Sequence, residues 1–278
     1  MDTIYILAAL ASALLHATWN AAVKSTGQHS AIMTGQMLVA ALVGLPVLLF
    51  VPMPNVASLG WIAASALFNV LGLRAILRAY DHGEFGLVYP MSRAIMIMLV
   101  VPLSTLLAHE QLSVGAMLGI ALIIAALTLL ALSARHGQEF SRHVLVWTGV
   151  GGVLTACTVL IDAHGIRQSG SPFAYGCVVA IVNAANMTWQ QRRRPGLFAT
   201  MRQHASVTWW SGALSMASYL LIVWVFSKAP IAGAAALRDT SSVFAVLIAM
   251  VFMKEAINRT KLLAVVMAVA AIPLMRLT

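Results

Sequence analysis

Ten long apolar runs follow one another along the chain, separated by short polar stretches. A helix that spans a bilayer needs about 20 mostly apolar residues. The runs have that length, and strands are not expected because a lipid-exposed sheet would leave its edges unsatisfied. The pattern predicts an all-α integral membrane protein with ten transmembrane helices, at roughly residues 4–24, 31–51, 60–79, 85–107, 114–133, 144–165, 173–190, 206–226, 231–253 and 260–277.

The segments between these runs are short and rich in helix-breaking residues, as in Pro52-Met53-Pro54 and Arg194-Pro195-Gly196. They leave no room for a soluble domain. The first run carries no A-x-A-like cleavage site, so we expect it to be kept as a helix and not removed as a signal peptide.

Two pairs of charged residues recur at the same spacing. Arg93 precedes Glu110 by 17 residues, and Arg238 precedes Glu255 by 17 residues, so the pairs are offset by 145. At the same offset Ser113 corresponds to Asn258, and both residue types favour helix N-caps. Three coincidences at one offset predict an internal duplication.

A looser match joins the first helix of each half. Lys24-Ser25-Thr26-Gly27 resembles Arg167-Gln168-Ser169-Gly170 at an offset of 143. We therefore expect two five-helix repeats, residues 1–138 and 139–278, within one transmembrane domain. Because five is odd, the second repeat enters the membrane inverted, an arrangement that recurs in secondary transporters.

Composition supports a membrane protein, since 61% of residues are hydrophobic and only 9% are charged. The net charge of +9 would suggest nucleic acid in a soluble protein, but here the basic residues cluster in loops, as the positive-inside rule expects. Neither Cys157 nor Cys177 suggests a disulfide or metal site, because both lie within apolar runs.

Lysine and arginine also predict an orientation. Three of them, Arg167, Lys228 and Arg276, lie at the even-numbered loops and the C-terminus, and twelve lie at the odd-numbered loops. This bias favours odd loops in the cytoplasm and both termini outside. The twelve are Lys24, Arg74, Arg78, Arg135, Arg142, Arg192, Arg193, Arg194, Arg202, Lys254, Arg259 and Lys261.

Over essentially its whole length the chain resembles the drug/metabolite transporter superfamily, in its EamA-type branch of ten-helix exporters. The residues that carry the resemblance are His16–Asn20, Asp162–Arg167, Tyr89–Glu110 and Ala229–Glu255. It implies secondary active export of amino acids or similar metabolites across a bacterial-type inner membrane, with a cavity lined by both halves. Many relatives have basic residues before the first helix, which would place the termini inside; this chain has Asp2 there.

Arginine inside a membrane helix is costly and therefore a functional candidate. Arg93 has Tyr89 one turn before it, and Arg238 occupies the corresponding place in the second half, beside Asp239. One or both guanidinium groups would bind a substrate carboxylate or phosphate. The alternative is structural, with each arginine paired to a glutamate or to helix-end carbonyls.

Polar residues on three other helices are further candidates. Ser12, His16 and Asn20 form a stripe along the first helix, next to Trp19, and we expect His16, Trp19 and Asn20 to bind substrate. On the seventh helix we expect the same of Asn183 and Asn186, which share a face with Gln190; the third helix offers Asn69. The aromatic residues Trp61, Tyr219 and Trp224 are expected to be packing residues or interfacial anchors.

Asp162 is the acid placed deepest in a predicted helix, after Thr155 and Thr158 on the same face. We expect it to carry a coupling proton, together with His16; the alternative is a salt bridge to Arg167 or to an intramembrane arginine. Glu110 and Glu255 lie at turns, where each is expected to bond free amides at the start of the next helix, a structural role. The alternative for both is proton coupling.

Several classes are disfavoured by absent motifs. The chain has no P-loop, dinucleotide fingerprint or HExxH sequence, so no cofactor and no enzymatic activity are expected. The partners expected are the bilayer, a small-molecule substrate and protons, with no nucleic acid. Gly115 and Gly119 form a small-residue pair, which leaves monomer and homodimer open. Competing hypotheses are efflux of a lipophilic cation, a membrane-embedded lipid enzyme and a structural subunit.

Overall fold

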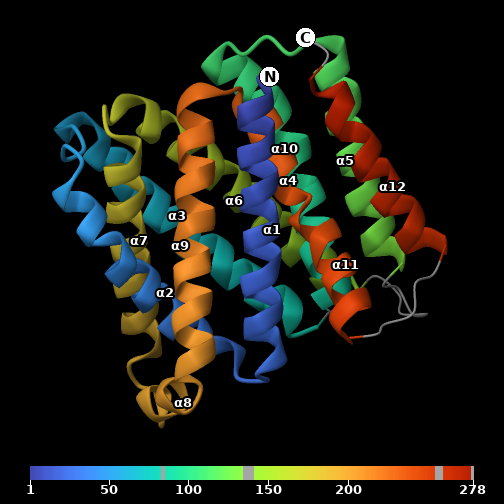
Figure 1. The fold of residues 1–278 in the computed structure, drawn as a ribbon. Coiled ribbons are helices and arrows are strands. Elements are labelled where there is room, and N and C mark those ends of the chain that lie inside the picture. Colours follow the sequence, from blue (N-terminus) through green and yellow to red (C-terminus); the bar gives the residue numbers. More distant parts are fainter. Residues whose placement is uncertain (83–84, 134–140, 254–258, 277–278) are drawn as a thin grey trace.

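The computed structural model describes residues 1–82, 85–133, 141–253 and 259–276, and Figure 1 shows them as one bundle of upright helices. The described residues contain no strand. The helices are α1 Thr3–Ser25, α2 His29–Gly44, η1 Pro46–Leu49, η2 Val56–Ser58, α3 Leu59–Tyr80, α4 Phe85–Ala108, α5 Val114–Ser133, α6 Arg142–Gln168, α7 Pro172–Gln191, α8 Leu197–Gln203, α9 Ala205–Lys228, α10 Ile231–Asp239, α11 Ser241–Met253 and α12 Arg259–Leu274.

The expected apolar ranges agree with these helices except at two breaks. The second range ends as an α-helix at Gly44, and Pro46 begins a 3₁₀ turn. The ninth range is divided at Thr240, whose hydroxyl donates to the carbonyl of Leu237 at 2.6 Å. Hydropathy does not detect such breaks, because the residues around them remain mostly apolar.

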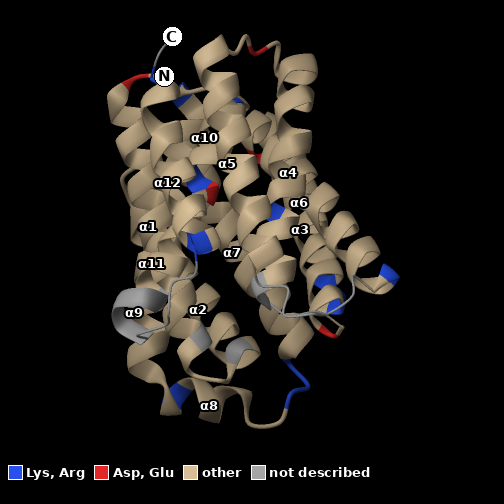
Figure 2. Cartoon of the chain, turned by 90° about the vertical axis from the view of Figure 1, so that its right-hand side faces the viewer, with Lys and Arg blue, Asp and Glu red and all other residues tan. Residues whose placement is uncertain are grey.

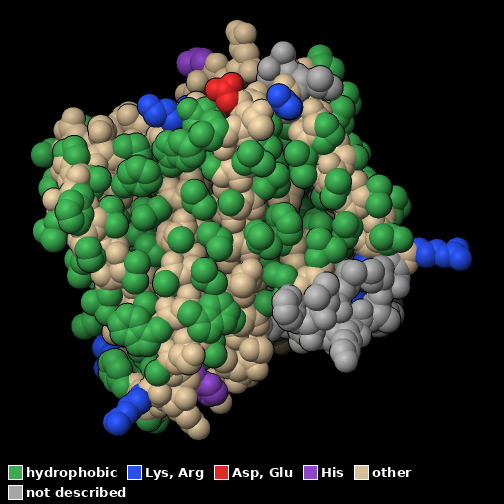
Figure 3. All heavy atoms as spheres, in the orientation of Figure 1, with side chains coloured by type: hydrophobic (Ala, Val, Ile, Leu, Met, Phe, Trp, Pro, Cys, Tyr) green, Lys and Arg blue, Asp and Glu red, His purple; other side chains and the backbone are tan. Residues whose placement is uncertain are grey.

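Eight of the described helical segments are long and apolar enough to cross a membrane, and α7 and α12 lie outside that set. Figure 3 shows apolar side chains across the middle of one face, with charged side chains toward its ends. An apolar belt between polar ends is the surface that a bilayer requires. The protein is therefore an all-α, multi-pass membrane protein.

Helices far apart in sequence pack together. The helix α1 packs against α9, α10 and α11, whereas α6 packs against α3 and α4, and α5 packs against α12. Ser12 and Ser218 fix α1 to α9, since the hydroxyl of each donates to the backbone carbonyl of the other at 2.7 and 2.8 Å. Gly119 lies where a Cβ would meet Met275 of the α12 side, so this small residue serves packing within the chain.

Contacts of Met1 and Arg167 near the start of α10 show that α1 and α6 run in opposite directions. Met1, just before α1, lies 3.5 Å from the Cβ position of Gly233, and Arg167 at the end of α6 bonds the Ala229 carbonyl. One helix therefore starts at the membrane face where the other ends. Figure 1 shows both chain termini at this face, opposite α8. We refer to it as the termini face.

Candidate functional site

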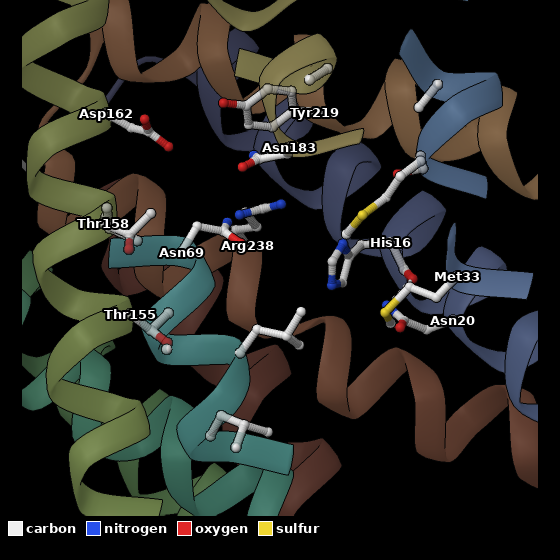
Figure 4. A pocket seen from close by; sticks show the side chains of 18 of the residues that line it. His16, Asn20, Met33, Asn69, Thr155, Thr158, Asp162, Asn183, Tyr219 and Arg238 are labelled. Carbon is white, nitrogen blue, oxygen red and sulfur yellow. Dashed lines mark hydrogen bonds between the residues drawn. The ribbon is translucent and has the colours of Figure 1, made fainter. Parts of the chain in front are cut away.

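A cavity of about 740 Å³ lies inside the bundle, between α1, α2, α3, α4, α6, α7, α9 and α10. Its volume suits a small molecule. At mid-depth the walls are polar, and Figure 4 shows several of these side chains pointing toward one another. The lining polar residues are His16, Asn20, Gln36, Asn69, Tyr80, Tyr89, Ser92, Arg93, Thr155, Thr158, Asp162, Asn183, Ser215, Tyr219 and Arg238.

The cavity extends toward the face opposite the termini. There it is lined by Val23, Leu77 and Tyr80, which lie in the last turns of α1 and α3. Toward the termini face it ends at the buried side chains of Ile166 and Phe226. The described structure is thus closed on the termini face.

Arg93 reaches the cavity from α4 and is tied to two other groups. Its Nη1 lies 3.9 Å from Asp239 Oδ1, and its guanidinium carbon lies 5.0 Å from the centre of the Tyr89 ring. The first contact is an ion pair between α4 and the end of α10, and the second has cation–π geometry. The structural alternative expected a glutamate or helix-end carbonyls as partners of Arg93; the partner in the structure is the carboxylate of Asp239.

Arg238 differs from Arg93 in having no carboxylate at ion-pair distance among the described residues, although it precedes Asp239 directly. It lines the cavity, and its buried Nε, like that of Arg93, has no hydrogen-bond partner among the described residues. In Figure 4 its side chain faces open space. A guanidinium in this position is available to a ligand.

Asp162 lines the cavity from α6, and the hydroxyl of Tyr175 on α7 donates to its Oδ1 at 3.1 Å. The expected alternative, a salt bridge to Arg167, does not form, since Arg167 bonds Glu110 instead. The reason is geometric, because residues five apart on a helix lie on different faces.

The polar stripe of α1 reaches the same cavity. His16 Nε2 lies 3.5 Å from the Tyr89 hydroxyl on α4, and the Trp19 ring meets His16 edge-on at 5.0 Å. The Asn20 amide donates to the His16 carbonyl at 2.9 Å, so one of its donors is already used within the helix. The structure thus brings His16, Trp19 and Asn20 to the cavity together with Tyr89.

Some of the other expected residues do not reach the cavity. Of the two asparagines of α7, Asn183 lines the cavity and Asn186 does not. Glu110 lies at the termini face, and it bonds the start of α10, not of the following helix α5 as expected. Glu255 lies outside the described residues, as do Arg135 and Lys254 of the loop charges.

Sequence reasoning missed Tyr219, which was expected to be a packing residue, and Gln36. Both line the cavity. A signal existed for each: Gln36 interrupts an apolar run, and Tyr219 follows Ser215 by one turn of α9. Polar residues inside a spanning helix usually face other protein or a cavity.

Six cavity-lining side chains hold a buried polar atom without a partner among the described residues. Buried polar groups in proteins are nearly always hydrogen-bonded, so this cluster is suited to bind water or a polar ligand. The six atoms are Trp19 Nε1, Gln36 Oε1, Arg93 Nε, Asn183 Oδ1, Tyr219 Oη and Arg238 Nε.

The fold and this cavity define a multi-pass membrane protein with an internal polar binding space. Residues 146–277 match the model of the EamA-like transporter family, which confirms the resemblance over the second half of the chain. The members of that family are transporters of small molecules, so the match favours transport over enzymatic chemistry.

Two further comparisons bear on the fold and on relatives. A crystal structure of another protein is similar with a TM-score of 0.76 and 15% sequence identity, over 99% of this chain and 96% of that one. At this identity the likeness concerns the fold alone. The comparison with curated proteins gave no match.

Proposed function

We propose that the protein is a secondary active transporter that exports small metabolites with a carboxylate, amino acids foremost, by alternating access. The observation that carries this proposal is the pairing, in one cavity, of the available Arg238 with Asp162. A guanidinium binds a carboxylate through a charge-assisted hydrogen bond. A carboxylate such as Asp162 binds an ammonium group in the same way.

The charges around the cavity favour a zwitterion. Arg93 and Asp239 neutralise each other at 3.9 Å, which leaves one positive and one negative group, Arg238 and Asp162, for the ligand. An amino acid carries both complementary charges, so binding would leave no charge unpaired in a low-dielectric site. Asn183 and Tyr219 add neutral donors and acceptors beside these two.

The remainder of the substrate would occupy the apolar end of the cavity. The side chains there are Met33, Met37, Leu73, Ile76 and Leu77. Methionine side chains adapt to ligands of different shape. This end would therefore accept an apolar side chain and select mainly by size.

For the scaffold we propose ten spanning helices in two inverted repeats, residues 1–138 and 139–278, with α7 and α12 added to the eight segments above. In support, the first helix of each half packs on later helices of the other half: α1 packs on α9 and α10, and α6 packs on α3 and α4. A duplication predicts this correspondence. Gly27 and Gly170, matched in the sequence, both have φ of +66° after the first helix of their half. Only glycine adopts this conformation without a steric cost.

We propose that the face opposite the termini is cytoplasmic, in a bacterial-type inner membrane. Figure 2 shows Lys and Arg gathering toward the end that carries α8, as the positive-inside rule expects of a cytoplasmic face. The cavity reaches the same face near Tyr80, which suits loading from the cytoplasm for export. A reporter enzyme fused to the C-terminus tests this, because activity only in the cytoplasm would reverse the assignment.

Thermal stability of the detergent-purified protein against a metabolite panel at two pH values tests the substrate class. Ligands that bind only the native state raise the melting temperature. A shift with amino acids that is lost in Arg238→Gln supports the proposal, as does uptake of the same compounds into proteoliposomes under a proton gradient. No shift and no uptake with any carboxylate would overturn it.

Efflux of a lipophilic cation remains the second candidate, because Asp162 supplies an acid in the cavity. Arg238 weighs against it, since an available guanidinium repels a cation. A melting shift with lipophilic cations alone, abolished in Asp162→Asn, would favour this candidate. A lipid enzyme has less support, because the described residues hold no group of three His, Cys, Asp or Glu side chains able to bind a metal.

A further inference from the structure

Glu110 follows α4 at the termini face and binds the start of α10. Its Oε1 and Oε2 accept the Ile231 amide at 2.7 and 2.8 Å, and Oε2 lies 3.4 Å from the Ala232 amide. These amides are the free donors of a helix N-terminus, where a negative charge is favourable. One carboxylate therefore joins the end of α4 to the beginning of α10.

Arg167, in the last turn of α6, completes the connection. Its Nη2 donates to Glu110 Oε1 at 2.9 Å and to the Ala229 carbonyl at 2.9 Å, while its Nε donates to the Phe226 carbonyl at 3.1 Å. The Glu110 side chain is only 7% exposed. One ion pair thus joins the termini-face ends of α4, α6, α9 and α10.

The pair lies next to the closed end of the cavity. Phe226, whose carbonyl Arg167 holds, and Ile166, the residue before Arg167, are the two side chains that end the cavity on this face. Opening the cavity here requires α6, α9 and α10 to separate. That separation would break the bonds between Glu110, Arg167 and the α10 amides.

We propose that the Glu110–Arg167 pair is the latch that holds the cavity closed on the termini face. Opening of this latch is the step that connects the cavity to the solution on that face. The inference rests on the proposed alternating access. The latch and the substrate site act on one short helix, because Ile231 lies two turns, about 10 Å, before Arg238. A substrate bound at Arg238 thereby contacts the helix that the latch restrains.

Cysteine labelling tests the latch without any substrate, so its failure is distinguishable from failure of the proposed transport. In a background with Cys157→Ser and Cys177→Ala, the buried Ala229→Cys reports on the termini face, and the cavity-lining Leu73→Cys on the opposite face. Each is labelled in oriented membranes with a membrane-impermeant maleimide from either side.

With Glu110→Gln or Arg167→Gln, labelling of Ala229→Cys from the termini face should rise by about tenfold, because a charge-assisted bond to the closed state is lost. Labelling of Leu73→Cys from the opposite face should fall. The matched control is Lys228→Gln, which removes a positive charge two residues after Phe226 and should change neither rate.

Unchanged labelling in both latch variants, with melting temperatures showing folded protein, would overturn the latch. Where Glu110→Gln or Arg167→Gln fails to fold, Arg167→Lys keeps the charge but loses the fork of three bonds, and should give an intermediate increase. An Arg167→Lys protein that is folded and labels like the parent also overturns it.

Discussion

Arg93 on α4 and Asp239 at the end of α10 form an ion pair inside the membrane-spanning bundle, with Arg93 Nη1 3.9 Å from Asp239 Oδ1. The pair gives the two arginines that match at an offset of 145 in the sequence different surroundings. Arg93 is held by a carboxylate and an aromatic ring, whereas Arg238 has no carboxylate at ion-pair distance among the described residues. The buried Nε of each arginine lacks a hydrogen-bond partner among these residues. The two arginines are therefore suited to different tasks, Arg93 to packing and Arg238 to binding.

Removing one member of this pair should cost more than removing both. Arg93→Gln leaves the buried carboxylate of Asp239 without its cation, and breaking a buried pair in this way costs about 3–5 kcal/mol. Adding Asp239→Asn removes the uncompensated charge and should restore most of the loss. Melting curves of the two single variants and the double variant measure this; losses that simply add would show that the pair is not coupled.

Arg238→Gln should instead affect binding. If the Arg238 guanidinium anchors the substrate carboxylate, its loss removes a charge-assisted bond and weakens binding by about 10–100-fold. The melting temperature without ligand should change little, since the side chain is not tied to a carboxylate at ion-pair distance among the described residues. Arg238→Lys should recover part of the affinity.

The control for Arg238→Gln is a second ligand that lacks the carboxylate, and not a second protein variant. The amine that corresponds to each bound amino acid without its carboxylate should bind Arg238→Gln at least as tightly as the parent, because the guanidinium only repels its ammonium group. An equal loss of affinity for the amine and the amino acid would mean that Arg238 shapes the cavity and does not contact the carboxylate.

Helix positions could be predicted from the sequence because spanning segments must be apolar over a fixed length, and α3, α4 and α5 begin and end within a residue of the expected ranges. The break at Thr240 could not, since Ser241 and Ser242 are followed by a strongly apolar run. The cavity residues of α1 were found because polar side chains at helical spacing stand out against an apolar background.

Partners across helices were not predictable. The sequence suggested that Glu110 bonds the next helix, but the amide it binds, at Ile231, lies 121 residues away. Asp162 and Arg167 looked like a pair in the sequence, yet Tyr175 bonds the aspartate. Such choices depend on how helices rotate and pack, which spacing within one helix does not determine.

Close helix packing gives a test on α6 that needs no ligand. A Cβ at Gly152 would lie 2.7 Å from Ile95 Cγ2 and 3.0 Å from the Ser92 carbonyl oxygen of α4, whereas nothing lies within 4 Å of the Cβ position of Gly149. Gly152→Ala should lower stability by about 1–3 kcal/mol through overpacking. Gly149→Ala, on the same helix, should be neutral or stabilising because alanine favours helix. Equal melting temperatures for the two variants would contradict the tight α4–α6 contact.

Asp162→Asn should separate proton coupling from substrate movement. If Asp162 carries the coupling proton, the amide removes the titrating group but keeps a hydrogen-bond partner for Tyr175, now 3.1 Å from Oδ1. Accumulation driven by a proton gradient should be lost in proteoliposomes, while exchange of labelled for unlabelled substrate continues at substrate concentrations raised to offset the lost contact with the ammonium group. Tyr175→Phe, which leaves the acid in place, should retain gradient-driven accumulation. Gradient-driven accumulation in Asp162→Asn equal to the parent would assign the proton to another group, and His16, on the opposite wall in Figure 4, is the next to replace.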